Sequence, residues 1–271
     1  MPPTRPLDRP RRHRRALAWA LAGLLAGVGM DLGAEAGVTA ARAGTGTGSG
    51  PGTDRMATTP NSLLVDSYDA LLRDGDVEKF RRDVSARYGE ATLARLLDSG
   101  NAKARRAAVL GLGLFGSYGA SNGVVAGALK DKDPTVRGLA RDALWAIWYR
   151  AGSPEQNATL GQIRKLIDAD RLPEAIERAD RLIAEAPDFA EAYNQRAIAH
   201  FLRGDPAASA ADCRLVLQRN PHHFGALGGL GQCLLQLDKR AEAVAVFRRA
   251  ADLQPFDEGL KDVIAALEGN R

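Results

Sequence analysis

Residues 224–257 read FGALGGLGQCLLQLDKRAEAVAVFRRAADLQPFD, and this stretch decides the fold. Its proline, Pro255, is the third of a series with Pro187 and Pro221, and 34 residues separate each from the next. A proline cannot continue a helix, so each one marks the end of a repeating unit. Apolar residues within each unit recur at the helical spacing, and no stretch shows the sustained alternation of a strand.

Other positions keep the same 34-residue step. Small or apolar residues recur where two helices of one unit are expected to cross, and turn-forming residues recur between them. These sets are Ala175, Ser209 and Ala243; Ile163, Ala197 and Gly231; and Asp170, Gly204 and Asp238. Small side chains at a crossing let two helix backbones approach closely, so the step predicts stacked helical pairs.

This pattern resembles the tetratricopeptide repeat (TPR) family, whose period is 34 residues. The copy at 224–257 carries the resemblance best, with consensus residues at Leu227, Leu230, Gly231, Leu234, Ala243, Phe247, Ala250 and Pro255. The first copy departs most, with Thr159 where an aromatic residue is usual and Gln162 where leucine is usual. The resemblance implies repeats at 156–189, 190–223 and 224–257. The amphipathic segment 258–271 then follows as a capping helix.

A second periodicity, of 32 residues, lies upstream. The segment 101–113 aligns with 133–145, which pairs Arg105 with Arg137. Asp133 followed by Pro134 is a strong helix start. This pattern resembles a HEAT-like unit, expected over 61–152, and the resemblance implies that both arginines bond to the neighbouring acidic turn. From residue 61 onward, the two resemblances therefore imply an all-α, right-handed α-solenoid.

The basic charge of the chain is confined to its N-terminus. The chain has 37 Lys and Arg against 33 Asp and Glu, and residues 1–43 hold seven arginines and three acidic residues of these totals. Subtraction leaves 30 basic and 30 acidic residues in 44–271. A neutral body lacks the basic stripe that phosphate binding needs, so no nucleic-acid partner is expected.

The N-terminus has the tripartite pattern of an export signal. Arginines at 5–15 precede the apolar run 16–30, and small-x-small sites follow. Residues 1–36 are expected to be a signal peptide or an N-terminal anchor, and 37–60, rich in Gly, Thr and Pro, a flexible linker. The expected location is the periplasm or cell envelope, with membrane contact only through an uncleaved N-terminal segment. Translation from Met56 would instead leave the protein in the cytoplasm.

No arrangement of residues indicates an enzyme, a cofactor or a metal site. His222 and His223 are adjacent, which is not ligand spacing, and both are expected to be solvated turn residues. Cys213 and Cys233 are expected to pack as small apolar residues, although exported location would also allow a disulfide. A separate aromatic cluster, Trp145, Trp148 and Tyr149, is expected to pack the HEAT-like unit against the first repeat.

The remaining candidate for a functional site is the surface of the repeats. In the TPR family the first helix of each repeat lines a concave groove. By that alignment the partner-binding residues here are Arg164, Asn194, Ile198, Phe201, Gln232 and Gln236. Amides suit a peptide backbone and apolar residues suit side chains, so the expected function is a non-enzymatic scaffold that binds a peptide or helix. The alternatives are a cytoplasmic, cochaperone-like regulator and, since HEAT-like units also occur in bilin-attaching lyases, an enzyme or enzyme subunit.

Overall fold

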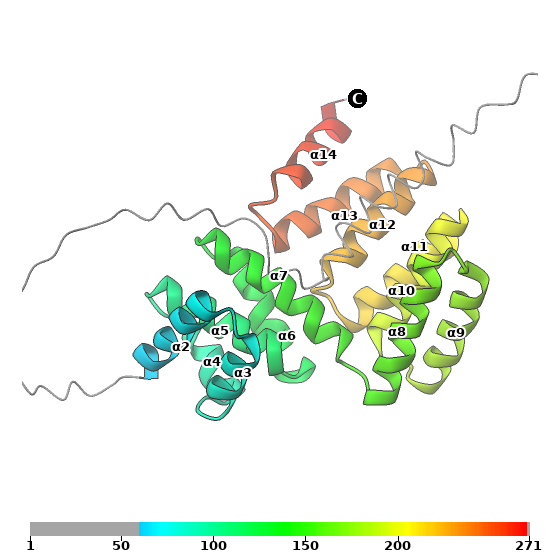
Figure 1. The fold of residues 1–271 in the computed structure, drawn as a ribbon. Coiled ribbons are helices and arrows are strands. Elements are labelled where there is room, and N and C mark those ends of the chain that lie inside the picture. Colours follow the sequence, from blue (N-terminus) through cyan, green and yellow to red (C-terminus); the bar gives the residue numbers. More distant parts are fainter. Residues whose placement is uncertain (1–59, 270–271) are drawn as a thin grey trace, which may run out of the picture.

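The computed structural model describes residues 60–269, in which thirteen α-helices and one short 3-10 helix occur and no strand is formed (Figure 1). The N-terminal unit consists of α2 (Pro60–Asp74), α3 (Val77–Ser85), α4 (Glu90–Leu96), α5 (Ala102–Phe115), α6 (Tyr118–Gly127), η1 (Ala128–Lys130) and α7 (Pro134–Tyr149). The repeats consist of α8 (Pro154–Asp168), α9 (Leu172–Glu185), α10 (Ala190–Arg203), α11 (Pro206–Arg219), α12 (Phe224–Gln236), α13 (Arg240–Leu253) and α14 (Glu258–Gly269). The all-α prediction is confirmed.

The 32-residue step of the N-terminal unit reappears as a repeated set of hydrogen bonds. Arg105 donates to the carbonyls of Ser99 and Gly100, and Arg137 donates to those of Asp131 and Lys132. Arg105 also bonds both carboxylate oxygens of Asp131, at 2.7 and 2.9 Å. Both arginines therefore brace the turn before their own helix, as the resemblance implied.

Each repeat turns between its two helices at the position that the sequence predicts. The residue at that position has a positive φ: 60° at Asp170, 87° at Gly204 and 58° at Asp238. In each case the next residue donates its N–H to a carbonyl five residues back, as Arg171 does to Leu166 at 2.8 Å. This left-handed residue satisfies carbonyls that a helix end otherwise leaves free.

The third repeat shows why a small residue is needed at the helix crossing. A Cβ placed on Gly231 of α12 would lie 2.5 Å from the ring of Phe247 on α13. The equivalent pair in the second repeat, 16 residues apart in the same way, is Ala197 and Cys213, both buried. A large residue on one helix of a repeat thus requires a small residue opposite it on the other helix, because both side chains occupy the same closely packed space.

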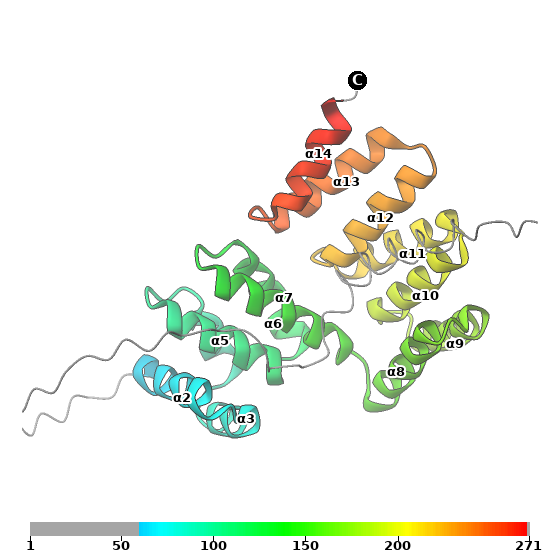
Figure 2. The ribbon, with the colours of Figure 1, turned by 45° about the horizontal axis from the view of Figure 1, so that its top comes forward.

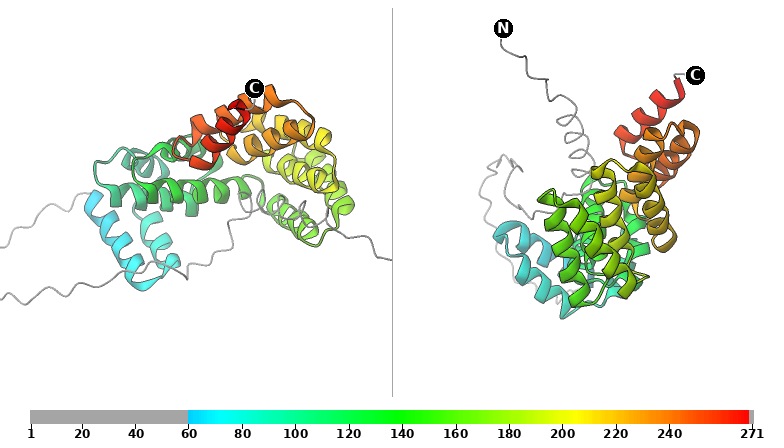
Figure 3. Two further views of the ribbon diagram at one scale, coloured as in Figure 1. Left: turned by 90° about the horizontal axis from the view of Figure 1, so that it is seen from above. Right: turned by 90° about the vertical axis from the view of Figure 1, so that its right-hand side faces the viewer.

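Helix α7 joins the N-terminal unit to the loops between the repeats, as Figures 2 and 3 show. The Trp148 ring stacks on His223, with centroids 4.2 Å apart, and Trp145 meets Phe224 edge-on at 5.4 Å. Phe224 consequently belongs to the apolar core of the N-terminal unit. The expectation that this cluster packs against the first repeat holds for Tyr149, whose ring lies under Arg164 of α8. It is wrong for the two tryptophans.

The reason for this correction is the curvature of the repeat stack. The second inter-repeat loop, 220–223, comes back to the side of α7, and the third brings Phe256 under the guanidinium of Arg137, 4.2 Å from its ring centroid. Side chains so far apart in the sequence cannot be paired by local periodicity alone. The contact between α7 and the loop 220–223 buries His223, which is 0% exposed. The expectation of two solvated histidines is therefore wrong for His223.

At its C-terminal end the stack is covered by α14. Four half-buried side chains of α14 pack against the core of the second and third repeats: Leu260, Val263, Ile264 and Leu267. Helix α14 has no fully buried residue, as suits the last layer of a solenoid. The predictions on residues 1–59 lie outside the described part of the chain. Within that part, no helix has the length and apolarity needed to cross a membrane.

Candidate functional site

The predicted groove residues lie on α8, α10 and α12, the first helices of the three repeats. Gln236 is exposed, and Arg164, Ile198, Phe201 and Gln232 are half-buried. Asn194 differs from the others, because only 2% of it is exposed. Five of the six predicted residues can therefore be reached from solvent in this conformation.

Two of these five also have structural partners. The guanidinium of Arg164 lies 4.3 Å from the centroid of the Tyr149 ring, so this predicted groove residue packs on the last residue of α7. Phe201 packs against the core shared by the second and third repeats. The sequence left open whether Phe201 is a groove residue or a core residue, and the structure shows it half-buried against that core.

Asn194 belongs to a buried polar network centred on Glu191. The Glu191 carboxylate is 1% exposed and accepts hydrogen bonds from Asn194 at 2.7 Å and Gln195 at 2.8 Å. His223 completes the set, since its Nε2 lies 3.1 Å from Glu191 Oε2. The backbone N–H of Ala226 donates to His223 Nδ1 at 2.9 Å, which places the ring proton on Nε2.

This network ties the second repeat to the start of the third and to α7. Glu191 is on α10, His223 precedes α12, and Trp148 of α7 stacks on the histidine ring. A buried carboxylate is costly unless donors surround it, and here three do. Sequence reasoning missed the site. Glu191 and His223 are 32 residues apart, which is not the 34-residue step of these repeats. The two side chains meet only because the repeat stack curves.

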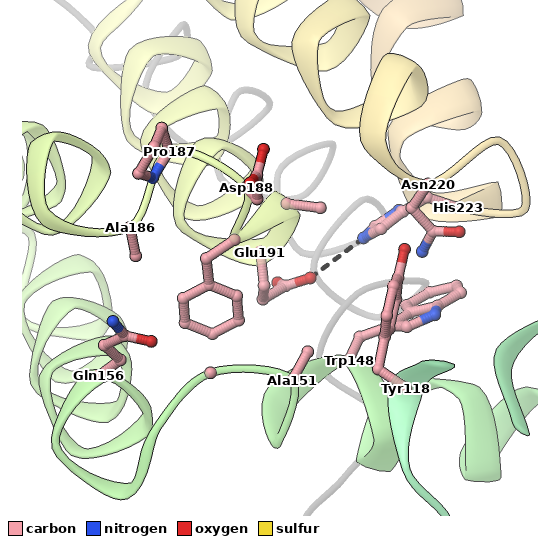
Figure 4. Close-up of a pocket in the computed structure, with 13 residues that line it drawn as sticks. Tyr118, Trp148, Ala151, Gln156, Ala186, Pro187, Asp188, Glu191, Asn220 and His223 are labelled. Atoms are coloured by element: carbon pink, nitrogen blue, oxygen red, sulfur yellow. Dashed lines mark hydrogen bonds and ion pairs between the residues drawn. The ribbon is translucent and has the colours of Figure 1, made fainter. Parts of the chain in front are cut away.

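A pocket lies beside this network, where the chain passes from α7 to α8 (Figure 4). Its volume is about 350 Å³. The residues that line it come from α6, α7, the start of α8, the start of α10 and the loops before α8, α10 and α12: Tyr118, Trp148, Ala151, Gly152, Gln156, Ala186, Pro187, Asp188, Phe189, Ala190, Glu191, Asn220 and His223. It is thus formed by the N-terminal unit and the repeats together.

The two cysteines are in an environment that makes their thiols unreactive. Both are buried free thiols, and Cys233 donates to the hydroxyl of Ser209 at 3.2 Å. Burial raises the pKa of each thiol, which keeps it protonated and poorly nucleophilic. In the described range, no three His, Cys, Asp or Glu side chains are grouped so as to hold a metal ion.

Comparison with known proteins agrees with the repeat geometry. Two tetratricopeptide repeat family models match residues 160–224 and 200–267. A TPR repeat-containing protein of Rhizobium etli is 30% identical over 146 residues, which cover 52% of this chain and 72% of that protein.

Two solved structures are similar at low identity. The first TPR of Spaghetti (RPAP3) bound to an HSP90 peptide is 20% identical, with a TM-score of 0.42, over 44% of this chain and 94% of that one. The TPR2AB-domain:pHSP90 complex of yeast Sti1 is 16% identical, with a TM-score of 0.38, over 77% and 84%. The repeat geometry, the family models and the Rhizobium relative agree, and the chain belongs to the tetratricopeptide repeat family.

Proposed function

We propose that the chain is a non-enzymatic scaffold that binds a peptide or a helix of a partner protein on the face formed by α8, α10 and α12. One observation carries the proposal. Side chains on this face stay partly exposed at the repeat spacing: Ile198 and Gln232 are 34 residues apart, and so are Leu202 and Gln236. Structural repeats alone do not require exposed apolar side chains at such positions.

The chemistry of the face suits an extended or helical peptide of low charge. Glutamine amides can both donate to and accept from a peptide backbone, and Ile198 and Leu202 offer apolar contacts. The guanidinium of Arg164 packs on the ring of Tyr149, and the side-chain amide of Asn194 donates a hydrogen bond to Glu191. Recognition of a C-terminal carboxylate, which needs several free cations and amides, is therefore not part of the proposal.

Selection of binders from a random peptide library on the full chain tests the proposal. The enriched peptides are then measured by fluorescence anisotropy against Gln236→Glu and Gln232→Glu, which place a charge on the face. Removing a neutral amide contact and adding a carboxylate should weaken binding about tenfold. Gln218→Glu is the matched control, because Gln218 is exposed on α11, a second helix of a repeat.

The outcomes separate the possible surfaces. Loss of affinity in the two α12 variants with an unchanged control supports the proposed face. Loss of affinity in Gln218→Glu alone would move the site to the second helices of the repeats. A library that yields no binder, or binders that all three variants hold equally well, contradicts the proposal.

A further inference from the structure

The face of α7 that meets the repeats carries an acidic residue. Trp145 meets Phe224 at the start of α12, and the ring of Tyr149 lies under Arg164 of α8. Asp142 stands three residues before Trp145 and seven before Tyr149, so these three side chains project from one face of the helix. The Asp142 carboxylate therefore lies on the side of α7 that the first helices of the repeats approach.

This carboxylate has no partner in the chain. Asp142 is exposed, and within residues 60–269 its carboxylate accepts no hydrogen bond and forms no ion pair. The atoms packed around it still remove part of its water, because burial raises the pKa of Asp142 and the adjacent Arg141 offsets this only in part. A partly desolvated carboxylate gains more from a cation than a fully hydrated one, since the effective dielectric constant around it is lower.

A second carboxylate lies nearby, at the end of α8. Asp168 is exposed, follows Arg164 by one helical turn and forms no ion pair in the described part of the chain. Burial raises the pKa of the Tyr149 hydroxyl, the charges of Glu191 and Asp168 raise it further, and Arg164 lowers it. The charge of Asp168 thus acts on the same ring as Arg164, and the α7 end of the face of α8, α10 and α12 holds two free carboxylates.

The cations of the three first helices do not neutralise these acids. The guanidinium of Arg164 packs on the ring of Tyr149. Arg196 bonds one carboxylate on α9 and one on α11, and Arg203 forms an ion pair with Asp205 at 3.7 Å. Lys165 projects about 100° round α8 from Arg164, and α12 has no charged residue. The group that complements this end of the face is therefore a cation.

We propose that the peptide recognised on the face of α8, α10 and α12 carries a lysine or arginine that pairs with Asp142 of α7. This pairing rests on the proposed function and adds a charge to the description of its partner. It also gives the N-terminal unit a part in recognition, since Asp142 belongs to α7 and not to a repeat. Gln232 lies eight residues beyond Phe224, about 12 Å along α12, so the basic side chain and the amide contacts belong to different parts of the peptide.

Selection on the full chain from two random peptide libraries is the first test. One library contains all residues, and the other lacks lysine and arginine. The complete library should yield peptides that share a basic residue at one position. Fluorescence anisotropy should show that these peptides bind about fivefold more tightly than the best peptides of the other library, which is the upper range for an ion pair at an exposed site.

A double-mutant cycle assigns the effect to Asp142. Asp142→Asn should weaken binding of the selected peptide about fivefold and leave unchanged the affinity of the same peptide with norleucine at the basic position. Asp252→Asn is the matched control, because Asp252 is an exposed acid on α13, a second helix of a repeat. Asp142→Lys should bind the peptide with glutamate at that position more tightly than the parent does, which a merely structural role of Asp142 would not produce.

Three results would overturn this pairing. The first is equal affinity of the peptides from the two libraries, with no shared basic position. The second is a loss of affinity in Asp142→Asn that is the same for the norleucine peptide. The third is an equal loss in Asp252→Asn, which would reflect net charge alone. In each of these cases Gln232→Glu still tests the proposed face by itself, whereas two libraries that yield no binder contradict both proposals.

Discussion

Substitution of Gly231 by alanine is the sharpest test of how the repeats pack. Added to Gly231, a Cβ would lie 2.5, 2.6 and 3.0 Å from three ring atoms of Phe247. That ring is 2% exposed and held among core residues, so it cannot move aside freely. Overpacking of this kind costs roughly 1–3 kcal/mol, whereas replacing a helical glycine by alanine gains about 0.5–1 kcal/mol. The net expectation is a loss of up to about 2.5 kcal/mol, centred near 1 kcal/mol.

The same helix offers the matched control. Gly228 is also in α12, and a Cβ there would meet no atom within 4 Å. Gly228→Ala should therefore stabilise the protein by about 0.5–1 kcal/mol, so that identical substitutions three residues apart have opposite signs. Phe247→Leu combined with Gly231→Ala should relieve the clash and give a stability above the sum of the single effects.

Urea unfolding followed by circular dichroism measures the parent, the three single variants (Gly231→Ala, Gly228→Ala and Phe247→Leu) and the double variant. A change of midpoint with an unchanged slope reports stability alone. Stability of Gly231→Ala equal to that of Gly228→Ala, or a double variant without coupling, would contradict this expectation. Either result would mean that the helix crossing of the third repeat is not limited by this contact.

Three further predictions concern the termini and turns of helices and the N-terminus. Asp133 bonds Arg106 and caps α7, and these contacts lower the pKa of Asp133 from 3.8 to about 2. The stability that Asp133 contributes is therefore present above about pH 4 and is lost as the pH falls toward 2. The unfolding free energy of Asp133→Asn should depend less on pH in that window. Gly204 has φ +87°, so Gly204→Ala should destabilise by about 1 kcal/mol, whereas Gly161→Ala, in an open helical position, should not. The mass of the native protein should correspond to a start between residues 37 and 60 if export and cleavage occur, and a full-length cytoplasmic species as the only form would contradict export.

The repeat fold could be predicted from the sequence because its determinants are local. Prolines at a 34-residue step, small residues at the crossings and turn residues such as Asp170, Gly204 and Asp238 each act within one repeat, and the structure places all three turn residues at positive φ. The 32-residue step upstream could be recognised for the same reason, since Arg105 and Arg137 each donate a hydrogen bond to a backbone carbonyl only six residues earlier in the chain.

The junction could not be predicted because it depends on the path of the whole stack. His223 was expected to be a solvated turn residue next to His222, and no pattern in the sequence singled out Asn220. Their burial follows from the contact between α7 and the second inter-repeat loop, which no periodicity encodes. The one signal in the sequence was the pair of tryptophans at the end of α7, whose surface had to be covered by something.

The central claim, that the face of α8, α10 and α12 binds a peptide partner, is tested most directly by mapping one selected peptide on the full chain. Backbone ¹H–¹⁵N shifts are recorded during titration with the peptide. The largest shifts should fall on α10 and α12 around Ile198, Gln232 and Gln236, and the shifts of α9, α11 and α13 should be small. Shifts concentrated on α9, α11 and α13, or on the N-terminal unit away from α8, would contradict it.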